Sequence, residues 1–210
     1  MIEHFDFNLQ ETWPFESRIR QSPIAVETSN IIQDDTLGVI SPVYSGVAWN
    51  VVDTGMSIQA SISGAALINH RLFEAQQVHF HAPAEHTIDG VQHAGELHIV
   101  HRRRVGSFAV MAIFFEVGPK NDEFEKLLTN IEQENRFSFD LTALLPDDLN
   151  YYHYLGSLTT PPLSENVEWY ILPKTMTLSE AQLARFHDIY PRNNRNLQPD
   201  NDRIIVTPGK

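Results

Sequence analysis

Cysteine is absent from all 210 residues of this chain. The fold therefore contains no disulfide bond, and a metal site would have to be built without thiolate ligands. Basic residues are also few, since 15 lysines and arginines face 27 aspartates and glutamates and the formal net charge is −12. Nucleic acids and anionic membranes bind to basic faces, so we expect neither as a partner.

Long apolar runs are missing as well. No stretch approaches the roughly 18 apolar residues that indicate a membrane span, and Met1 to Asp6 lack the basic start and apolar stretch of a secretory signal. We expect a protein that is cytoplasmic as given, or periplasmic or secreted if the chain is a processed form. Length and apolar content predict one domain over residues 1–210, with 1–20 as an irregular surface segment, and leave the oligomeric state open.

Short apolar runs broken by glycine and proline predict a mainly β fold with several strands. We expect two of these strands over 47–52 and 57–63, on either side of turns. Residues 108–117 are apolar on both faces, which is typical of a central strand.

Helices are few in the sequence pattern. An apolar stripe predicts one amphipathic helix that begins after Asn121 and ends near Glu134. The sequence Thr177-Leu178-Ser179-Glu180 predicts a capping box that opens a second helix, which runs to about His187.

Six of the ten histidines are concentrated in residues 77–101. His79 and His81 are two residues apart, and on a strand such side chains stand on the same face, about 6.7 Å from each other. The turn signal Asp89-Gly90 predicts that the chain folds back and brings His98 beside this pair. Three imidazoles with an open fourth position describe a catalytic zinc site.

The parity of the strands also places a hydrogen-bond acceptor beside these histidines. Gln77 shares the face of His79 and His81, and Glu96 shares the face of His98. Acceptors there would fix the tautomers of metal ligands. A lone histidine is more often a surface or core residue, but three in register with a carboxamide and a carboxylate favour the metal.

A second constellation follows near the C-terminus. Taken alone, Thr159-Thr160-Pro161-Pro162 predicts only a rigid loop before a strand. Together with the histidine cluster, however, residues 156–162 resemble the α-class carbonic anhydrases. The resemblance extends from Gln21-Ser22-Pro23-Ile24 to the pattern Asn193-x-Arg195-x-x-Gln198-Pro199. It implies a large, twisted, mostly antiparallel sheet with a few small surface helices, and zinc at the bottom of a conical cleft.

The resemblance implies Zn²⁺ as the cofactor and gives each of its ligands a hydrogen-bond partner. The ligands His79, His98 and His81 would be supported by the side chains of Gln77 and Glu96 and the main-chain carbonyl of Asn193, respectively. Thr159 would accept a hydrogen bond from zinc-bound hydroxide and donate its own to Glu85. His86 and Tyr154 match buried network residues.

The substrate pocket is implied in the same way. Thr160 would line its polar side, and an apolar wall for carbon dioxide would consist of Val100, Val110, Leu158, Val167 and Trp169. For the three valines an ordinary core position is nearly as good an interpretation. In carbonic anhydrases as a class, zinc lowers the pKa of water to about 7, so that hydroxide attacks carbon dioxide and gives bicarbonate. Sulfonamide-type and anionic inhibitors are further expected ligands.

The chain departs from the family at Val47, where fast members carry a histidine that relays protons to solvent. Valine cannot relay a proton. Direct release from a group of pKa about 7 is limited to on the order of 10³ per second. We therefore expect turnover to be limited by proton release unless another group, such as His4, acts as the shuttle.

Two rival interpretations remain. One is a non-catalytic carbonic-anhydrase-like binding module, but such relatives usually lack a ligand histidine and all three are present here. The other is a structural zinc site, which needs a fourth protein ligand such as His86 or His101. His101 has the opposite strand parity to His98 and is expected to point away.

Overall fold

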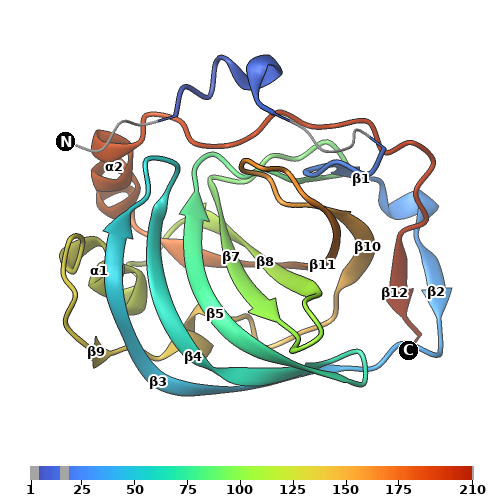
Figure 1. Cartoon of the computed structure of the whole chain (residues 1–210), viewed down its shortest axis with the longest axis horizontal. Coiled ribbons are helices and arrows are strands. Elements are labelled where there is room, and N and C mark those ends of the chain that lie inside the picture. The colour runs from blue at the N-terminus through green and yellow to red at the C-terminus, as the bar shows by residue number, and fades with distance from the viewer. Residues whose placement is uncertain (1–4, 15–18, 210) are drawn as a thin grey trace.

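The structure, a computed structural model, describes residues 5–14 and 19–209 and is built around one large sheet (Figure 1). Within the described residues this sheet has ten strands, in the spatial order β2 (Ile32–Asp34), β12 (Val206–Pro208), β10 (Tyr152–Ser157), β11 (Glu165–Leu178), β8 (Phe108–Val117), β7 (Gly95–Arg102), β5 (Arg71–His81), β4 (Ile58–Ile68), β3 (Ile40–Asp53) and β9 (Phe137–Ser138). Among the described strands of this sheet, only the pairs β11–β8 and β12–β2 are parallel. The predicted mainly β, mostly antiparallel fold is confirmed, and so is the central place of β8.

The strands β3 and β4 are longer than the sequence pattern predicts. Pro42 and Gly46, which the pattern assigns to turns, both lie inside β3. Gly46 has a φ of 71° and sits at a β-bulge, where the register with β4 shifts between Tyr44 and Ala48. Bulges bend a strand without ending it, so a glycine that looks like a break in the sequence instead curves the sheet.

The helix α1 (Asp122–Thr129) begins where predicted but ends five residues early. Its N-cap Asn121 accepts hydrogen bonds from two main-chain N–H groups of the first turn. The chain then leaves the helix because its next residues pair with β3: the N–H of Glu132 donates to the carbonyl of Val51, and the N–H of Val51 donates to the carbonyl of Gln133.

The helix α2 (Glu180–Ile189) lies beside α1 at one end of the sheet (Figure 1). Its capping box is formed by Ser179 and Gln182, not by Thr177 and Glu180 as predicted, because Thr177 still pairs with Glu116 at the end of β11. The remaining small elements are the parallel pair β1 (Ala25–Val26) and β6 (Thr87–Ile88), and 3-10 turns at Gln10–Thr12, Thr28–Asn30 and Leu141–Leu144.

Two apolar clusters cover the two faces of the sheet. The larger one includes Phe80 and both helices, and the smaller one includes Val110 and Trp169. Residues 5–14 are more than the surface segment predicted, since Phe7 and Trp13 are buried and form a third small cluster. No helix in the described ranges is both long enough and apolar enough to cross a membrane.

Candidate metal centre

The pairing of β5 with β7 sets the geometry of the candidate metal centre. These strands are antiparallel, with His79 directly opposite His98 and His81 directly opposite Glu96. The predicted proximity of the three histidines is therefore confirmed. The turn at Asp89-Gly90 exists, but it closes only the short bridge between Ile88 and Val91, within a longer connection that contains β6.

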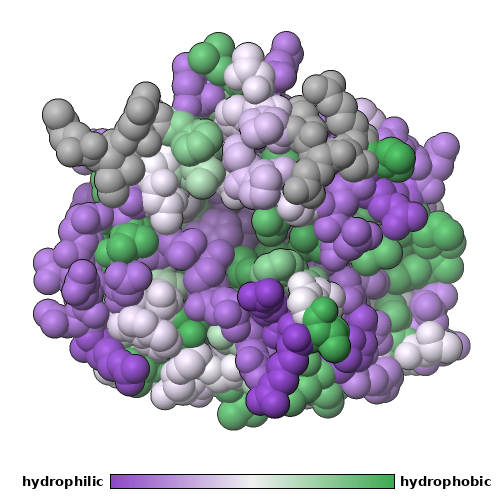
Figure 2. Space-filling model, viewed as in Figure 1, coloured by the Kyte–Doolittle hydropathy of each residue, from purple (hydrophilic) through white to green (hydrophobic). Residues whose placement is uncertain are grey.

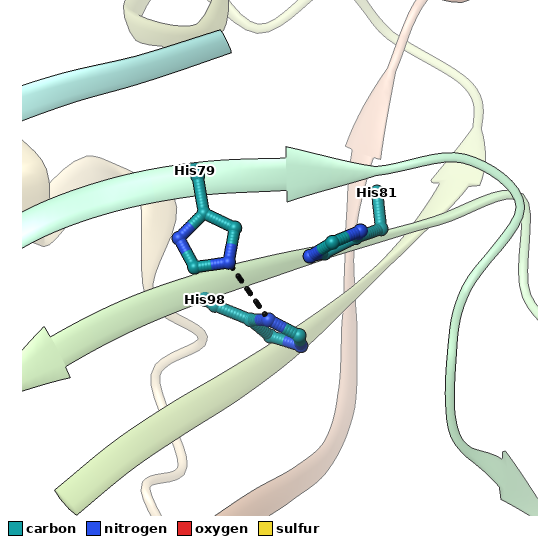
Figure 3. Close-up of side chains that lie close together, drawn as sticks. All are labelled: His79, His81 and His98. Atoms are coloured by element: carbon teal, nitrogen blue, oxygen red, sulfur yellow. Dashed lines mark hydrogen bonds between the residues drawn. The ribbon is translucent and has the colours of Figure 1, made fainter. Parts of the chain in front are cut away.

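The three imidazoles point toward one another from the two strands (Figure 3). The ring centroids of His79 lie 5.0 Å from those of both His81 and His98, and the last two are 4.7 Å apart. One nitrogen from each ring lies within 4.8 Å of the other two. Nε2 of His79 and Nδ1 of His98 approach to 3.2 Å. The cluster can thus present three nitrogen lone pairs to a single ion.

The nitrogen on the other side of each ring is held by an acceptor. The contacts are His79 Nδ1 to Gln77 Oε1 at 2.8 Å, His81 Nδ1 to the carbonyl oxygen of Asn193 at 2.7 Å, and His98 Nε2 to Glu96 Oε1 at 2.7 Å. An N–H that donates to such an acceptor fixes the tautomer and leaves the remaining nitrogen free to bind metal. The donor set fits zinc, and Nε2 of His81 is buried without a hydrogen-bond partner among the described residues.

The charges around the cluster suit neutral ligands. Burial lowers the pKa of His79 and His81, so both rings stay uncharged near neutral pH. Burial alone would raise the pKa of Glu96, but His86 and His98 hold it well below its usual range. An ionised Glu96 accepts the N–H of His98 strongly, which raises the basicity of that ring toward a metal.

Glu85 lies next to the cluster and is only 1% exposed. Its Oε1 accepts the main-chain N–H of Arg195 at 2.7 Å, and its Oε2 lies 3.6 Å from Nε2 of His81 and 4.0 Å from Nδ1 of His98. Oε2 has no hydrogen-bond partner among the described residues. Thr159 is also buried, but in this structure no hydrogen bond joins it to Glu85.

A cleft of about 250 Å³ opens beside the histidines and lies over β5, β7 and β8. Figure 2, which has the same viewpoint as Figure 1, shows a hollow in the surface where polar and apolar residues meet. The cleft is lined by Gln76, Gln77, His79, His98, Val100, Arg102, Phe108, Val110, Leu158, Thr159, Thr160 and Trp169. Of the predicted wall residues only Val167 is not part of this lining, although it is buried in the same apolar cluster as Val110 and Trp169.

Sequence reasoning missed three residues of this lining, namely Gln76, Arg102 and Phe108. Gln76 enters it through a bulge that shifts the register between Ala75 and Gln77, and the sequence carries no signal for that bulge. Arg102 could have been found by parity, because it shares the face of His98 in β7. It is the exposed last residue of β7, and its guanidinium lies over the ring of Phe108, 5.5 Å from the ring centroid.

Neither proposed fourth ligand is free to complete the metal centre. Both nitrogens of His86 are engaged, one by Glu96 and the other by the hydroxyl of Tyr154, each at 2.7 Å. His101 lies on the opposite face of β7, where its Nε2 contacts the hydroxyl of Tyr44 at 3.0 Å. The predicted candidates therefore leave the cluster with three histidine ligands, of which His79 and His98 line the cleft.

The expected proton-relay position is occupied by a half-buried side chain. Val47 lies in β3, opposite Ser138 of β9, and does not line the cleft. His4, the other candidate for a shuttle, lies outside the described residues.

Comparison with known proteins agrees with this geometry. The model of the eukaryotic-type carbonic anhydrase family matches residues 8–208. A carbonic anhydrase of Klebsiella pneumoniae is 35% identical over 218 aligned residues, which cover 97% of this chain and 86% of the relative. The solved structure of the α-carbonic anhydrase of Thermovibrio ammonificans with the inhibitor sulfanilamide has a TM-score of 0.83 and 35% identity, over 89% of this chain and 86% of that one.

A third similar protein is a carbonic anhydrase of Chlamydomonas reinhardtii, solved in complex with acetazolamide. It shares 29% identity and a TM-score of 0.80 with this chain, over 90% of each. The family model, the sequence relative and the two solved structures each cover most of the chain, and the residues matched by the family model include the histidine strands. This chain belongs to the eukaryotic-type carbonic anhydrase family.

Proposed function

We propose that this protein catalyses the reversible, zinc-dependent hydration of carbon dioxide to bicarbonate and a proton. The observation that carries the proposal is the set of three converging imidazoles, each with its second nitrogen held by an acceptor and two of them lining the cleft. Membership of the family supports carbonic anhydrase activity in general. When bound, zinc makes hydroxide available near neutral pH by acidifying water.

The residues of the chain divide the remaining tasks. His79, His81 and His98 hold the metal, and the apolar side chains of the cleft exclude water from the place where carbon dioxide rests. Thr160 lines the polar side, where it can bind the bicarbonate product. Carbon dioxide is apolar and bicarbonate is charged, so a cleft with one apolar and one polar side favours entry of one and departure of the other.

Glu85 and Thr159 are proposed to orient the attacking hydroxide. Oε2 of Glu85 is a buried acceptor without a partner among the described residues, and a Thr159 hydroxyl that donates to it would have its lone pairs left to accept a hydrogen bond. A threonine fixed in this way favours a group that can donate a hydrogen bond, such as hydroxide or water, over an anion that carries no hydrogen. This pair would therefore select the reactive oxygen and set its direction.

Proton release is proposed to be the slow step, because Val47 stands where a relay histidine would be. The test is stopped-flow carbon dioxide hydration on zinc-loaded protein over a series of imidazole-type buffer concentrations. We expect activity that rises with buffer concentration and disappears in His98→Ala. Fast turnover that does not depend on buffer concentration would contradict the proposal that proton release is slow. If the protein bound one zinc per chain but hydrated no carbon dioxide at any buffer concentration, the proposed activity would be wrong and a binding module would be favoured.

Inhibitor binding provides a second measurement. The two similar solved proteins were crystallised with sulfanilamide and acetazolamide, which supports sulfonamides as ligands of this chain. We expect both compounds, and simple anions, to bind the zinc-loaded protein and to compete with each other. Calorimetric titration of the zinc-loaded and zinc-free forms would show whether the metal is required.

A further inference from the structure

A second and larger cavity lies away from the metal centre. Its volume is about 530 Å³, it is partly open to solvent, and it is bordered by β10, β12, residues 19–20 and residues 201–204. It shares no lining residue with the catalytic cleft. Such a volume is enough for a small organic molecule.

Two guanidinium groups, from Arg20 and Arg203, line this cavity. Arg203 is held in place by the main-chain carbonyls of Pro199 and Asp200, which its nitrogens reach at 2.8 and 2.7 Å. Its guanidinium also lies over the ring of Tyr154, with 5.3 Å between the group and the ring centroid. These contacts fix the position of Arg203 and leave some of its N–H groups for another acceptor.

Neither arginine is neutralised within the described part of the chain. Asp202 also lines the cavity, but no carboxylate of the described residues lies within 4.0 Å of the guanidinium nitrogens of Arg20 or Arg203. Burial lowers the pKa of Arg203, and the charge of Arg20 adds to this lowering while Asp200 and Glu165 oppose it. Two like charges that face one cavity in a protein of net charge −12 point to an anionic ligand.

The rest of the lining is largely apolar. Ile19, Leu155, Ile204 and Val206 contribute aliphatic surface, and Tyr154 contributes its ring. His153 also lines the cavity, and burial lowers its pKa, so it adds no positive charge near neutral pH. A bare inorganic anion would leave this apolar surface in contact with water.

We propose that this cavity is a binding site for a small organic carboxylate. The carboxylate would lie against Arg20 and Arg203, which suits the planar, two-pronged donors of guanidinium. The apolar body of the ligand would cover the aliphatic side chains that line the cavity. The site is independent of carbon dioxide hydration and does not require the metal.

The test compares benzoate with its neutral analogue benzamide, using amide chemical shifts of the whole protein. We expect benzoate to shift the amides of Leu155, Asn201 and Ile204 in a saturable way, with a Kd on the order of 1 mM for a ligand of this size. Benzamide should bind about tenfold more weakly, because it carries no negative charge and offers only one acceptor oxygen to the guanidinium groups. Equal affinity of the two probes would overturn the proposal.

Two variants separate the charge from any effect on folding. Arg203→Gln removes the fixed donor, and Arg20→Gln removes a group whose side chain makes no hydrogen bond within the described residues. Each substitution should raise the Kd for benzoate by about tenfold. Arg104→Gln is the matched control, because Arg104 is exposed, pairs with Glu74 and lines neither cavity. The affinity of this variant for benzoate should stay within about twofold of that of the parent protein.

The place of binding is decided by which amides move. Benzoate could also act as an anionic ligand of the metal centre, which would shift Thr159 and Thr160 instead. Shifts confined to those two residues, or unchanged affinity in both arginine variants, would overturn the proposal. Repeating the titration on zinc-free protein should leave the shifts at Leu155 and Ile204 unchanged.

Discussion

The two faces of β5 and β7 are built from alternate residues of the same strands, yet the residues on the two faces have different roles. On one face His79, His81 and His98 converge on a point. On the other face Phe80 and Ile99 are buried in the main core. Along each strand, successive residues therefore belong alternately to the metal site and to the apolar core.

The core face is specified by volume. The ring of Phe80 packs edge-on against Phe115, Phe124 and Phe186, with centroid distances of 5.6, 4.7 and 5.1 Å. Any apolar group of similar size satisfies most of what this position requires. Its partners come from β8 and from both helices, so this face joins the sheet to α1 and α2.

The metal face is specified by single atoms. His81 depends on the main-chain carbonyl of Asn193, 112 residues further along the chain, and Glu85 depends on the N–H of Arg195. Buried polar groups destabilise a fold unless each one has a partner, so these contacts leave little freedom for substitution. The comparison predicts that changes on the core face alter folding while changes on the metal face alter binding.

The largest effect is expected from Phe80→Ala. The loss of a buried phenylalanine typically costs about 3–5 kcal/mol in the free energy of unfolding. Chemical denaturation should show this loss, while the zinc affinity of the folded fraction should stay close to that of the parent. Phe80→Leu is the control and should cost less than about 1.5 kcal/mol. A variant that folded well but lost zinc would break the separation of the two faces.

The neighbouring substitution His79→Ala should have the opposite outcome. It removes one of three ligands, so zinc affinity should fall by more than about a hundredfold, the upper end of what the loss of a partner behind a ligand causes. The unfolding midpoint of the zinc-free protein should change far less than in Phe80→Ala. Competition with a chelator measures the affinity, and retention of tight zinc binding would show that the metal lies elsewhere.

The same division explains which features could be predicted from the sequence. Strand parity alone placed His79, His81 and His98 on one face, because alternation is a local property of a strand. The contact of His81 with Asn193 has no local signal, and only the family resemblance pointed to it. The bulge at Gln76 was invisible, since nothing in the residue types distinguishes it from a regular strand.

The fold was predictable to the same extent. Short apolar runs predicted a mainly β fold, while the mostly antiparallel sheet was implied by the family resemblance, and the start of α1 after Asn121 followed from its apolar stripe. The early end of α1 was missed because pairing of Gln133 with Val51 overrides the helical stripe, a tertiary effect that local periodicity does not contain. The cavity near Arg203 was missed for a similar reason, because Arg20 and Arg203 are far apart in the sequence.

A smaller effect is expected from Gln77→Ala, which tests the layer behind the ligands. Loss of the acceptor for Nδ1 of His79 should reduce zinc affinity about 10- to 100-fold. Gln76→Ala is a matched control, since Gln76 also lines the cleft but bonds only the main-chain carbonyls of Glu74 and Ala75. Thermal unfolding with and without zinc reports both affinities, because metal that binds the folded state raises the midpoint. Equal losses in the two variants would mean that the acceptor beside His79 has no special role.

The smallest effect is expected from Val47→His at the edge of the sheet. This change adds a group that titrates near neutral pH, so it should raise carbon dioxide hydration by about tenfold in dilute buffer. The gain should vanish at high imidazole concentration, where the buffer already carries the protons. Val43→His is the matched control, because Val43 lies on the same strand, is 75% exposed and does not line the cleft. If the control accelerated turnover equally, any surface imidazole would suffice and Val47 would not be the missing step. If neither variant changed the rate, proton release would be limited by the residues that line the cleft and not by the absence of a histidine at position 47.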